Sequence, residues 1–147
     1  VLAVQDLLGR RILLENPSAY VGFRSSSMGE GDFLAAVARE ADCGILLDVN
    51  NLCVSARNLA FDPRAYLAAL PPERVEQIHL SGHADMGDVL LDTHQGPVPD
   101  AVWDLYREAV RLFGPTSTIV EWDTAVPSLQ TLVAETRRAA AMEARAA

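Results

Sequence analysis

The chain has 147 residues, of which 50% are hydrophobic and 22% charged, which is typical of a folded globular domain and excludes a disordered or fibrous chain. Its formal net charge of -8 repels phosphate backbones, so nucleic acid is not expected as a partner. Cys43 and Cys53 lack CxxC spacing and no apolar run is long enough to span a membrane, so we expect the reducing cytoplasm and no membrane contact.

Four short apolar runs predict β-strands. Each run is too short for a helix, is rich in Ile, Leu or Val, and lies beside residues that favour turns. Their nearly continuous apolar character is typical of strands that are buried on both faces of a parallel sheet. The predicted strands are Arg10–Glu15, Cys43–Asp48, Val75–Leu80 and Ser117–Glu121.

Amphipathic helices are expected around these strands. Trp103 and Tyr106 recur at helical spacing and are interpreted as core residues rather than as part of a cofactor site. The expected helices are residues 1–8, one capped by Asp32, one from Asp62 to about Leu70, one from Asp100 to Gly114, and one from about Pro127. The helix capped by Asp32 is expected to bury Phe33, Leu34, Val37 and Ala41.

Strands that alternate with helices predict an α/β fold with a parallel sheet. Four βα units fit a small open sheet, and they are also half of a (β/α)8 (TIM) barrel, which typically needs about 250 residues. We therefore expect residues 1–147 to be a single domain that is the C-terminal half of a TIM barrel. The chain begins with Val1 rather than Met, which favours a fragment of a longer protein.

Each predicted strand carries a residue suited to metal binding or catalysis at its C-terminal end. In parallel α/β folds these ends face the ligand, so four such residues are expected to meet at one site. An isolated acid at a strand end is often only a helix cap or turn residue, but four together favour a site. The four residues are Glu15, Asp48, His79 and Glu121.

The segment after the third strand adds Asp92 and His94 in a D-x-H pair. Carboxylates and imidazoles without thiolates suit iron, manganese or zinc, with open positions for water, substrate or dioxygen. Six candidate ligands exceed the needs of one ion, so we predict two or more metal ions that share a bridging carboxylate.

Five phrases carry a specific resemblance: LLENPSAY, LLDVNN, QIHLSGH, LLDTHQGPV and IVEWD. In this order and spacing they resemble the family catalogued as domain of unknown function 692 (DUF692, UPF0276), now called the multinuclear non-haem iron-dependent oxidases. The order of acids and histidines is also similar to the wider xylose-isomerase-like barrel superfamily, which includes endonuclease IV. The resemblance implies that the metal ligands are Glu15, Asp48, His79, Asp92, His94 and Glu121.

The same resemblance implies a function. Members of this family use iron and dioxygen to modify ribosomally made precursor peptides, often at cysteine, and a partner protein commonly presents the peptide. We therefore expect two or three iron ions as cofactor, with zinc or manganese as alternatives, a peptide substrate and a peptide-presenting partner protein.

Two departures from the superfamily pattern keep other interpretations open. Asn51 stands where endonuclease IV has a histidine ligand, and further histidine ligands of the superfamily come from strands that would precede Val1. One alternative is a divalent-metal hydrolase or sugar isomerase, related to endonuclease IV. Another is an inactive half-barrel that binds metal weakly or pairs with a second copy as a homodimer.

Further polar residues lie beside the predicted ligands. His83 and Asp123 are candidate catalytic residues. His83 is expected to contact the substrate, to act as an extra ligand or to support a ligand, and the alternative is a loop histidine that bonds only to backbone. Asp123 is expected to form a hydrogen bond with a ligand histidine. Cys53 is expected in the loop after Asp48 and is given no role, and Trp122 is expected to pack. The candidate supporting amides, which are also common turn residues, are Asn16, Asn50 and Asn51.

Overall fold

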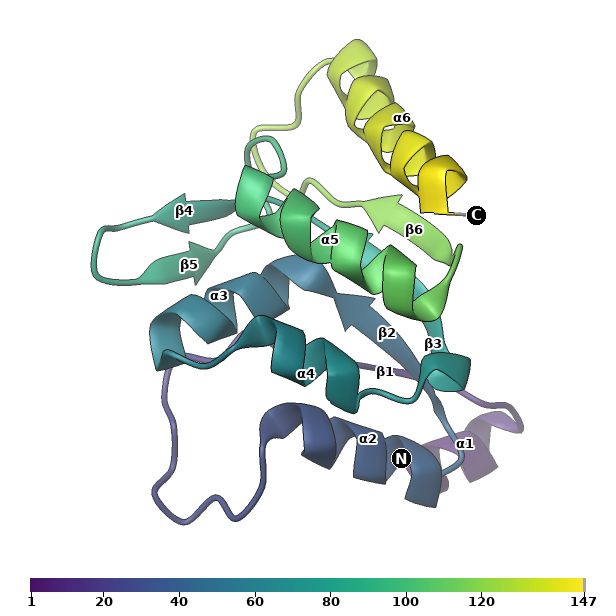
Figure 1. Cartoon of the computed structure of the whole chain (residues 1–147). Helices are drawn as coiled ribbons and strands as arrows, with labels where there is room; N and C mark the ends of the chain where they lie inside the picture. Colours follow the sequence, from purple (N-terminus) through teal and green to yellow (C-terminus); the bar gives the residue numbers. More distant parts are fainter. Residues whose placement is uncertain (147) are drawn as a thin grey trace.

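The computed structural model describes residues 1–146 and confirms the predicted α/β class and parallel sheet. Successive strands of this sheet lie side by side in the order β1-β2-β3-β6, all parallel (Figure 1). This is the arrangement of half a (β/α)8 barrel. The strands are β1 (Leu13–Glu15), β2 (Gly44–Asp48), β3 (Val75–Leu80) and β6 (Ser117–Val120).

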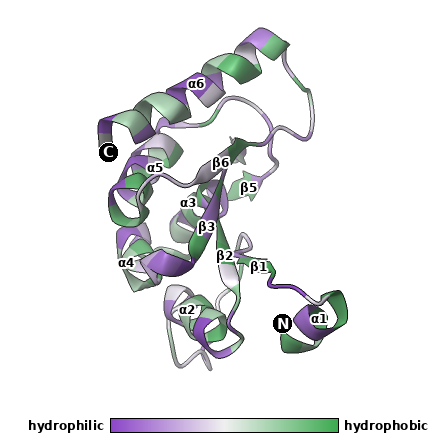
Figure 2. Cartoon of the chain, turned by 90° about the vertical axis from the view of Figure 1, so that its right-hand side faces the viewer, coloured by the Kyte–Doolittle hydropathy of each residue, from purple (hydrophilic) through white to green (hydrophobic). Residues whose placement is uncertain are grey.

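Helices follow the strands and cover one face of the sheet. In Figure 2, α4, α5 and α6 stand on one side of the strands, whereas α1 lies on the other side, near their lower ends. The helices are α1 (Leu2–Leu8), α2 (Glu30–Glu40), α3 (Val49–Leu59), α4 (Pro63–Ala69), α5 (Asp100–Phe113) and α6 (Leu129–Ala146), with a 3-10 turn η1 (Pro72–Arg74). Within residues 1–146, no helix has both the length and the apolar character of a membrane span.

The core lies between the sheet and these helices. Ile45 and Leu47 of β2 and Ile78 of β3 are fully buried, as are Trp103 and Tyr106 of α5, which confirms the core role predicted for the two aromatic residues. Their rings meet edge to face with centroids 5.9 Å apart. This apolar layer fixes the sheet against its helices and so fixes where the strand ends lie.

Several predicted boundaries were wrong by a few residues. The first strand begins at Leu13 instead of Arg10, because residues 10–12 are still tied to α1: the backbone N–H of Arg10 donates to the carbonyl of Gln5, and that of Ile12 donates to the side chain of Gln5. The second strand begins at Gly44, one residue after Cys43. The last strand ends at Val120, although the N–H of Glu121 still donates to the carbonyl of Leu80.

The start and inner face of α2 also differ from the prediction. The cap is Gly29, and Asp32 lies inside the first turn, where its negative charge still favours the helix N-terminus. Phe33 is 58% exposed instead of buried. It lies one residue, about 100° around the helix axis, from the buried residue Leu34.

Besides the short 3-10 turn η1, two elements were not predicted. The first is α3, which starts directly at the end of β2, so Cys53 is a buried helix residue and not, as expected, part of a loop. The second is an antiparallel hairpin of β4 (His83–Asp85) and β5 (Leu90–Asp92), which projects beyond the C-terminal end of the sheet (Figure 1). Both elements bring polar residues to that end.

Candidate metal centre

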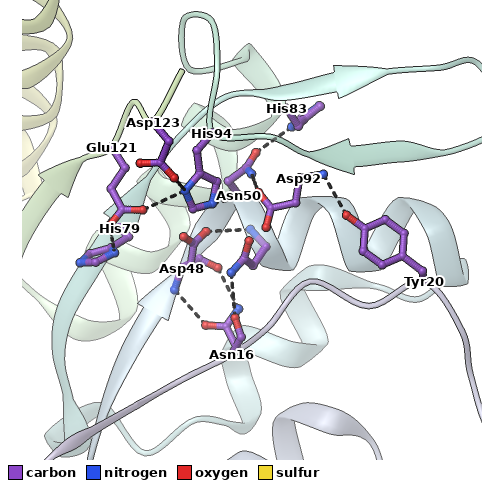
Figure 3. A network of polar contacts seen from close by, with 11 residues as sticks. Asn16, Tyr20, Asp48, Asn50, His79, His83, Asp92, His94, Glu121 and Asp123 are labelled. Carbon is purple, nitrogen blue, oxygen red and sulfur yellow. Dashed lines mark hydrogen bonds and ion pairs between the residues drawn. The ribbon is translucent and has the colours of Figure 1, made fainter. Parts of the chain in front are cut away.

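The predicted ligands come from five different segments and gather at the C-terminal end of the sheet, and Figure 3 labels all of them except Glu15. Three of them are supplied by the strands β1, β2 and β3, one follows β6, and two belong to β5 and the loop after it. In chain order these residues are Glu15, Asp48, His79, Asp92, His94 and Glu121.

Two groups of three residues have their donor atoms within 4.8 Å of one another. Glu15, Asp48 and His79 form one group, and Asp48, His94 and Glu121 form the other. Asp92 belongs to neither group, but its Oδ1 lies 2.9 Å from Nε2 of His94. Because Asp48 is common to both groups, the donors form one continuous cluster that could hold a metal ion.

The spacing between ring nitrogens and carboxylate oxygens fits neighbouring ligands of one cation. Nδ1 of His79 lies 2.6 Å from Oε1 of Glu121, and Nδ1 of His94 lies 3.1 Å from Oε2 of the same residue. Both ring nitrogens of His79 are buried without a hydrogen-bond partner, so the short contact to Glu121 lacks hydrogen-bond alignment. Two adjacent ligands bound at about 2.1 Å to one ion stand roughly 3 Å apart, which matches these distances.

Asp48 is the most buried carboxylate of the cluster, with 0% exposure. Its Oδ1 accepts from the N–H of Asn51 at 2.7 Å and so caps α3, whereas its Oδ2 is buried without a partner. Burial raises the pKa of Asp48 to about 7. A carboxylate with one satisfied and one orphaned oxygen is poorly stabilised as an isolated anion, and a bound cation would satisfy the orphaned oxygen.

Asn16 and Asn51 hold the backbone around Asp48. The Asn16 amide both accepts from the N–H of Asp48 at 2.8 Å and donates to its carbonyl at 2.9 Å. Nδ2 of Asn51 donates to the carbonyl of Asn16 at 3.1 Å. These two buried amides therefore join the ends of β1 and β2, and they position Asp48 through its main chain.

Asn50, His83 and Asp92 form a second polar chain at the edge of the cluster (Figure 3). Nδ2 of Asn50 donates to Oδ1 of Asp92 at 3.0 Å, and Oδ1 of Asn50 lies 2.7 Å from Nδ1 of His83. Burial lowers the pKa of His83, which favours its neutral form. His83 is the first residue of β4. It pairs with Asp92 across the hairpin, and its ring contacts the amide of Asn50.

Tyr20 contacts the predicted ligand Asp92, and the sequence analysis did not identify it. Its hydroxyl accepts the N–H of Asp92 at 2.9 Å, which ties the β1–α2 connection to the hairpin. The only sequence signal was its place in the first resembling phrase, shortly after the end of the first strand.

Asp123 lies at the rim of the cluster. Its Oδ2 is 3.3 Å from Nδ1 of His94, its N–H donates to the carbonyl of His94, and its side chain is 69% exposed. The carboxylate is thus beside a predicted ligand and also open to solvent.

His94 has a backbone conformation that L-residues rarely adopt, with φ of 45°. The loop after it passes against Gly82, where an added Cβ would lie 2.1 Å from the carbonyl oxygen of Gln95. Such strain persists only where surrounding structure imposes it, and it is common at functional sites. Close packing on Gly82 therefore helps to hold His94 toward the cluster.

Comparisons with known proteins identify relatives of this chain. The family model described as "RiPP precursor modification enzyme MbnB/TglH/ChrH" matches residues 1–144. A UPF0276 protein of Anaeromyxobacter sp. (strain Fw109-5) is 64% identical over 146 residues, which is 99% of this chain and 52% of the relative.

Two more UPF0276 proteins show similar coverage. The one from Acaryochloris marina (strain MBIC 11017) is 52% identical over 92% of this chain and 49% of its own length. The one from Chromobacterium violaceum is 51% identical over 97% of this chain and 51% of its own length. The chain thus spans about half the length of these curated relatives.

Proposed function

The chain belongs to the family of RiPP precursor modification enzymes MbnB/TglH/ChrH, and on that premise we propose that it carries part of the metal shell of an iron-dependent oxidase. The substrate in this proposal is a ribosomally made precursor peptide, often oxidised at cysteine. Residues 1–147 would then form half of a TIM barrel within a longer protein, in line with relatives about twice as long.

The observation that carries this proposal is the convergence of histidine and carboxylate donors, without thiolate, at the C-terminal end of a parallel sheet. This donor set suits iron, and zinc or manganese are the alternatives. When bound there, iron would supply the binding and reduction of dioxygen beside the substrate.

The chain's own residues favour two ions rather than one. Glu121 turns one carboxylate oxygen toward His79 and the other toward His94, and Asp48 belongs to both donor groups. Glu121 and Asp48 would then help to hold both ions. Glu15 and His79 would complete one ion's shell, and His94, with Asp92 beside it, the other's.

Residues at the rim are assigned to the substrate side of the site. The largely exposed carboxylate of Asp123 lies beside His94, where a bound peptide could reach it, and it is our candidate for substrate contact or proton transfer. His83 is a candidate for the same role from the hairpin side. A peptide-presenting partner protein and a cytoplasmic location remain predictions.

A homodimer is the alternative way to complete the barrel. The sheet ends in two strands, β1 and β6, whose outer edges pair with no other strand within residues 1–146. Pairing β6 of one copy with β1 of a second would give eight strands, the number in a TIM barrel.

The metal assignment is tested by native mass spectrometry and elemental analysis of protein grown with added iron. His79→Ala and Asp92→Ala should each lower the bound metal per chain and leave the circular dichroism spectrum unchanged, because neither residue belongs to the apolar core. Asp104→Ala, which changes an exposed acid on α5, is the matched control. Unchanged metal content in both ligand variants would refute the site.

The dependence of activity on dioxygen distinguishes an oxidase from a hydrolase or isomerase that uses the same metal ligands. Ferrous-iron-dependent consumption of dioxygen with a candidate precursor peptide supports the oxidase. Turnover with zinc or magnesium under anaerobic conditions would instead support metal-assisted hydrolysis or isomerisation.

A further inference from the structure

We propose that Asn50 is a positioning residue of the metal centre, and that His83 sets the direction of its amide so that the NH2 group faces the ligand Asp92. This inference rests on the proposed metal site and assigns a role to two residues outside both donor groups. The contacts that carry it are Nδ2 of Asn50 to Oδ1 of Asp92 at 3.0 Å and Oδ1 of Asn50 to Nδ1 of His83 at 2.7 Å (Figure 3).

The direction of the Asn50 amide follows from what its neighbours can donate. An ionised Asp92 only accepts hydrogen bonds, so it requires the NH2 end of the amide. The carbonyl end then faces His83, which must carry a proton on Nδ1 to donate to it. The opposite tautomer of His83 would place two lone pairs against each other or would turn the amide carbonyl toward the Asp92 carboxylate, and both arrangements are repulsive.

Asn50 is well placed to hold a ligand because it is buried at the start of a helix. It is 0% exposed and lies in the first turn of α3, two residues after Asp48, which caps that helix. Asp92 belongs to the hairpin, outside the main sheet. The Asn50 amide therefore links a ligand on the hairpin to the rigid helix start that carries the central ligand, and it leaves Oδ2 of Asp92 free of this bond.

The same helix supplies an internal control. Asn58, near the other end of α3, also binds β5, but through the backbone: its Nδ2 donates to the carbonyl of Leu90 at 3.0 Å, and its Oδ1 accepts from the Leu90 N–H at 2.9 Å. Removing Asn58 loosens the hairpin without touching a ligand side chain. A purely structural role for Asn50 would give the same result as Asn58.

The experiment is a titration of the metal-free chain with Co²⁺, followed by its visible absorption, and with Fe²⁺, followed by bound metal. Asn50→Ala should weaken metal binding roughly 10- to 100-fold, the usual cost of losing a group that orients a ligand, and should change the Co²⁺ spectrum. Asn58→Ala should lower the unfolding midpoint and leave metal affinity and the spectrum close to those of the unchanged chain.

His83 variants test the direction of the amide. His83→Leu removes the donor and should weaken metal binding, whereas His83→Asn places an NH2 group near the position of Nδ1 and should restore most of the affinity. In the Asn50→Ala background, His83→Leu should have no further effect, because its influence passes through the amide. Equal losses in both backgrounds would overturn the role of His83.

Asp92→Ala distinguishes failure of this inference from failure of the metal site. If Asp92→Ala binds metal like the unchanged chain, Asp92 is not a ligand and the proposed site is wrong at this position. If Asp92→Ala loses metal while Asn50→Ala retains full affinity and an unchanged Co²⁺ spectrum, the site stands and the positioning role is refuted.

Discussion

The two faces of the four-stranded sheet have opposite properties. On the helix-covered face, Ile78 of β3 is fully buried, and Thr118 of β6 is hydrogen-bonded to Tyr106 and Glu143. On the opposite face, Ile119 is 42% exposed, although it follows Thr118 directly in the same strand. One alternating strand thus supplies a packed layer on one side and an open layer on the other.

This difference between the two faces indicates that the residues that stabilise the fold are distinct from those that are expected to bind metal. The covered face carries the apolar core, whereas the predicted ligands gather at the C-terminal end of the sheet. Substitutions on the covered face should therefore change the free energy of unfolding. Substitutions at the cluster should change metal binding, and those elsewhere on the open face should change little unless something covers it.

The largest effect is expected from Trp103 on the covered side. Trp103 is fully buried, and the Arg138 guanidinium lies 4.5 Å from the centre of its ring. Trp103→Ala should lower the free energy of unfolding by roughly 3–5 kcal/mol, because it removes a large core side chain and leaves a cavity. Urea unfolding measures the change, with Trp103→Phe as a milder variant that is expected to fold.

Leu129→Ala serves as the control, since Leu129 is 75% exposed at the start of α6. Its cost should stay within about 0.5 kcal/mol. Comparable losses for Trp103→Ala and Leu129→Ala would mean that the covered face is not the main source of stability.

The covered face was also the more predictable one. Apolar runs located all four strands, and helical spacing placed Trp103 and Tyr106 in the core, because burial leaves a direct pattern in hydrophobicity. The same rule failed at Phe33, where one apolar residue beside a buried stripe was taken as part of it. Helix α3 was missed because Asp48 is at once the last strand residue and the helix cap, which leaves no connecting loop to mark the change.

The sequence indicated which residues would lie close together and named three candidate supporting amides, but it did not indicate the contacts that these supports make. Their positions at strand ends predicted that Glu15, Asp48 and His79 lie close together, because the C-terminal ends of parallel strands meet at one edge of the sheet. The roles of Tyr20 and Asn50 depend on the hairpin, which folds back over α3 and whose short strands have little periodicity. Contacts between segments far apart in the chain leave no such local pattern.

A substitution at Asp48 is expected to change the free energy of unfolding less than Trp103→Ala does, and to raise it instead of lowering it. Asp48→Asn keeps an oxygen to cap α3 and removes a buried charge, so the metal-free chain should become more stable at pH 8 by roughly 1–3 kcal/mol. Metal binding should be lost in the same variant. Thermal unfolding with and without added metal measures both effects.

The pH dependence of this gain follows from the pKa of Asp48, which burial raises to about 7. Between about pH 4, the ordinary value for Asp, and pH 7, the folded chain holds a proton that the unfolded chain has released, so the stability of the unchanged chain falls as pH rises. The Asn variant lacks this slope. The two chains should therefore converge near pH 4, and a gain that is equal at pH 4 and pH 8 would contradict the charge explanation.

The smallest change in the free energy of unfolding is expected for substitutions on the open face. Its size shows whether that face is exposed to solvent in solution. Ile119→Ala should cost about 0.5 kcal/mol or less, as surface changes do, whereas Ile78→Ala should cost about 2–5 kcal/mol. If a second copy covers the open face, Ile119 becomes a core residue of the assembly, and the cost of Ile119→Ala rises with protein concentration while that of Ile78→Ala does not. Unfolding curves for both variants at low and high protein concentration, with sedimentation to record the oligomeric state, therefore distinguish a permanently open sheet from a barrel completed by self-association.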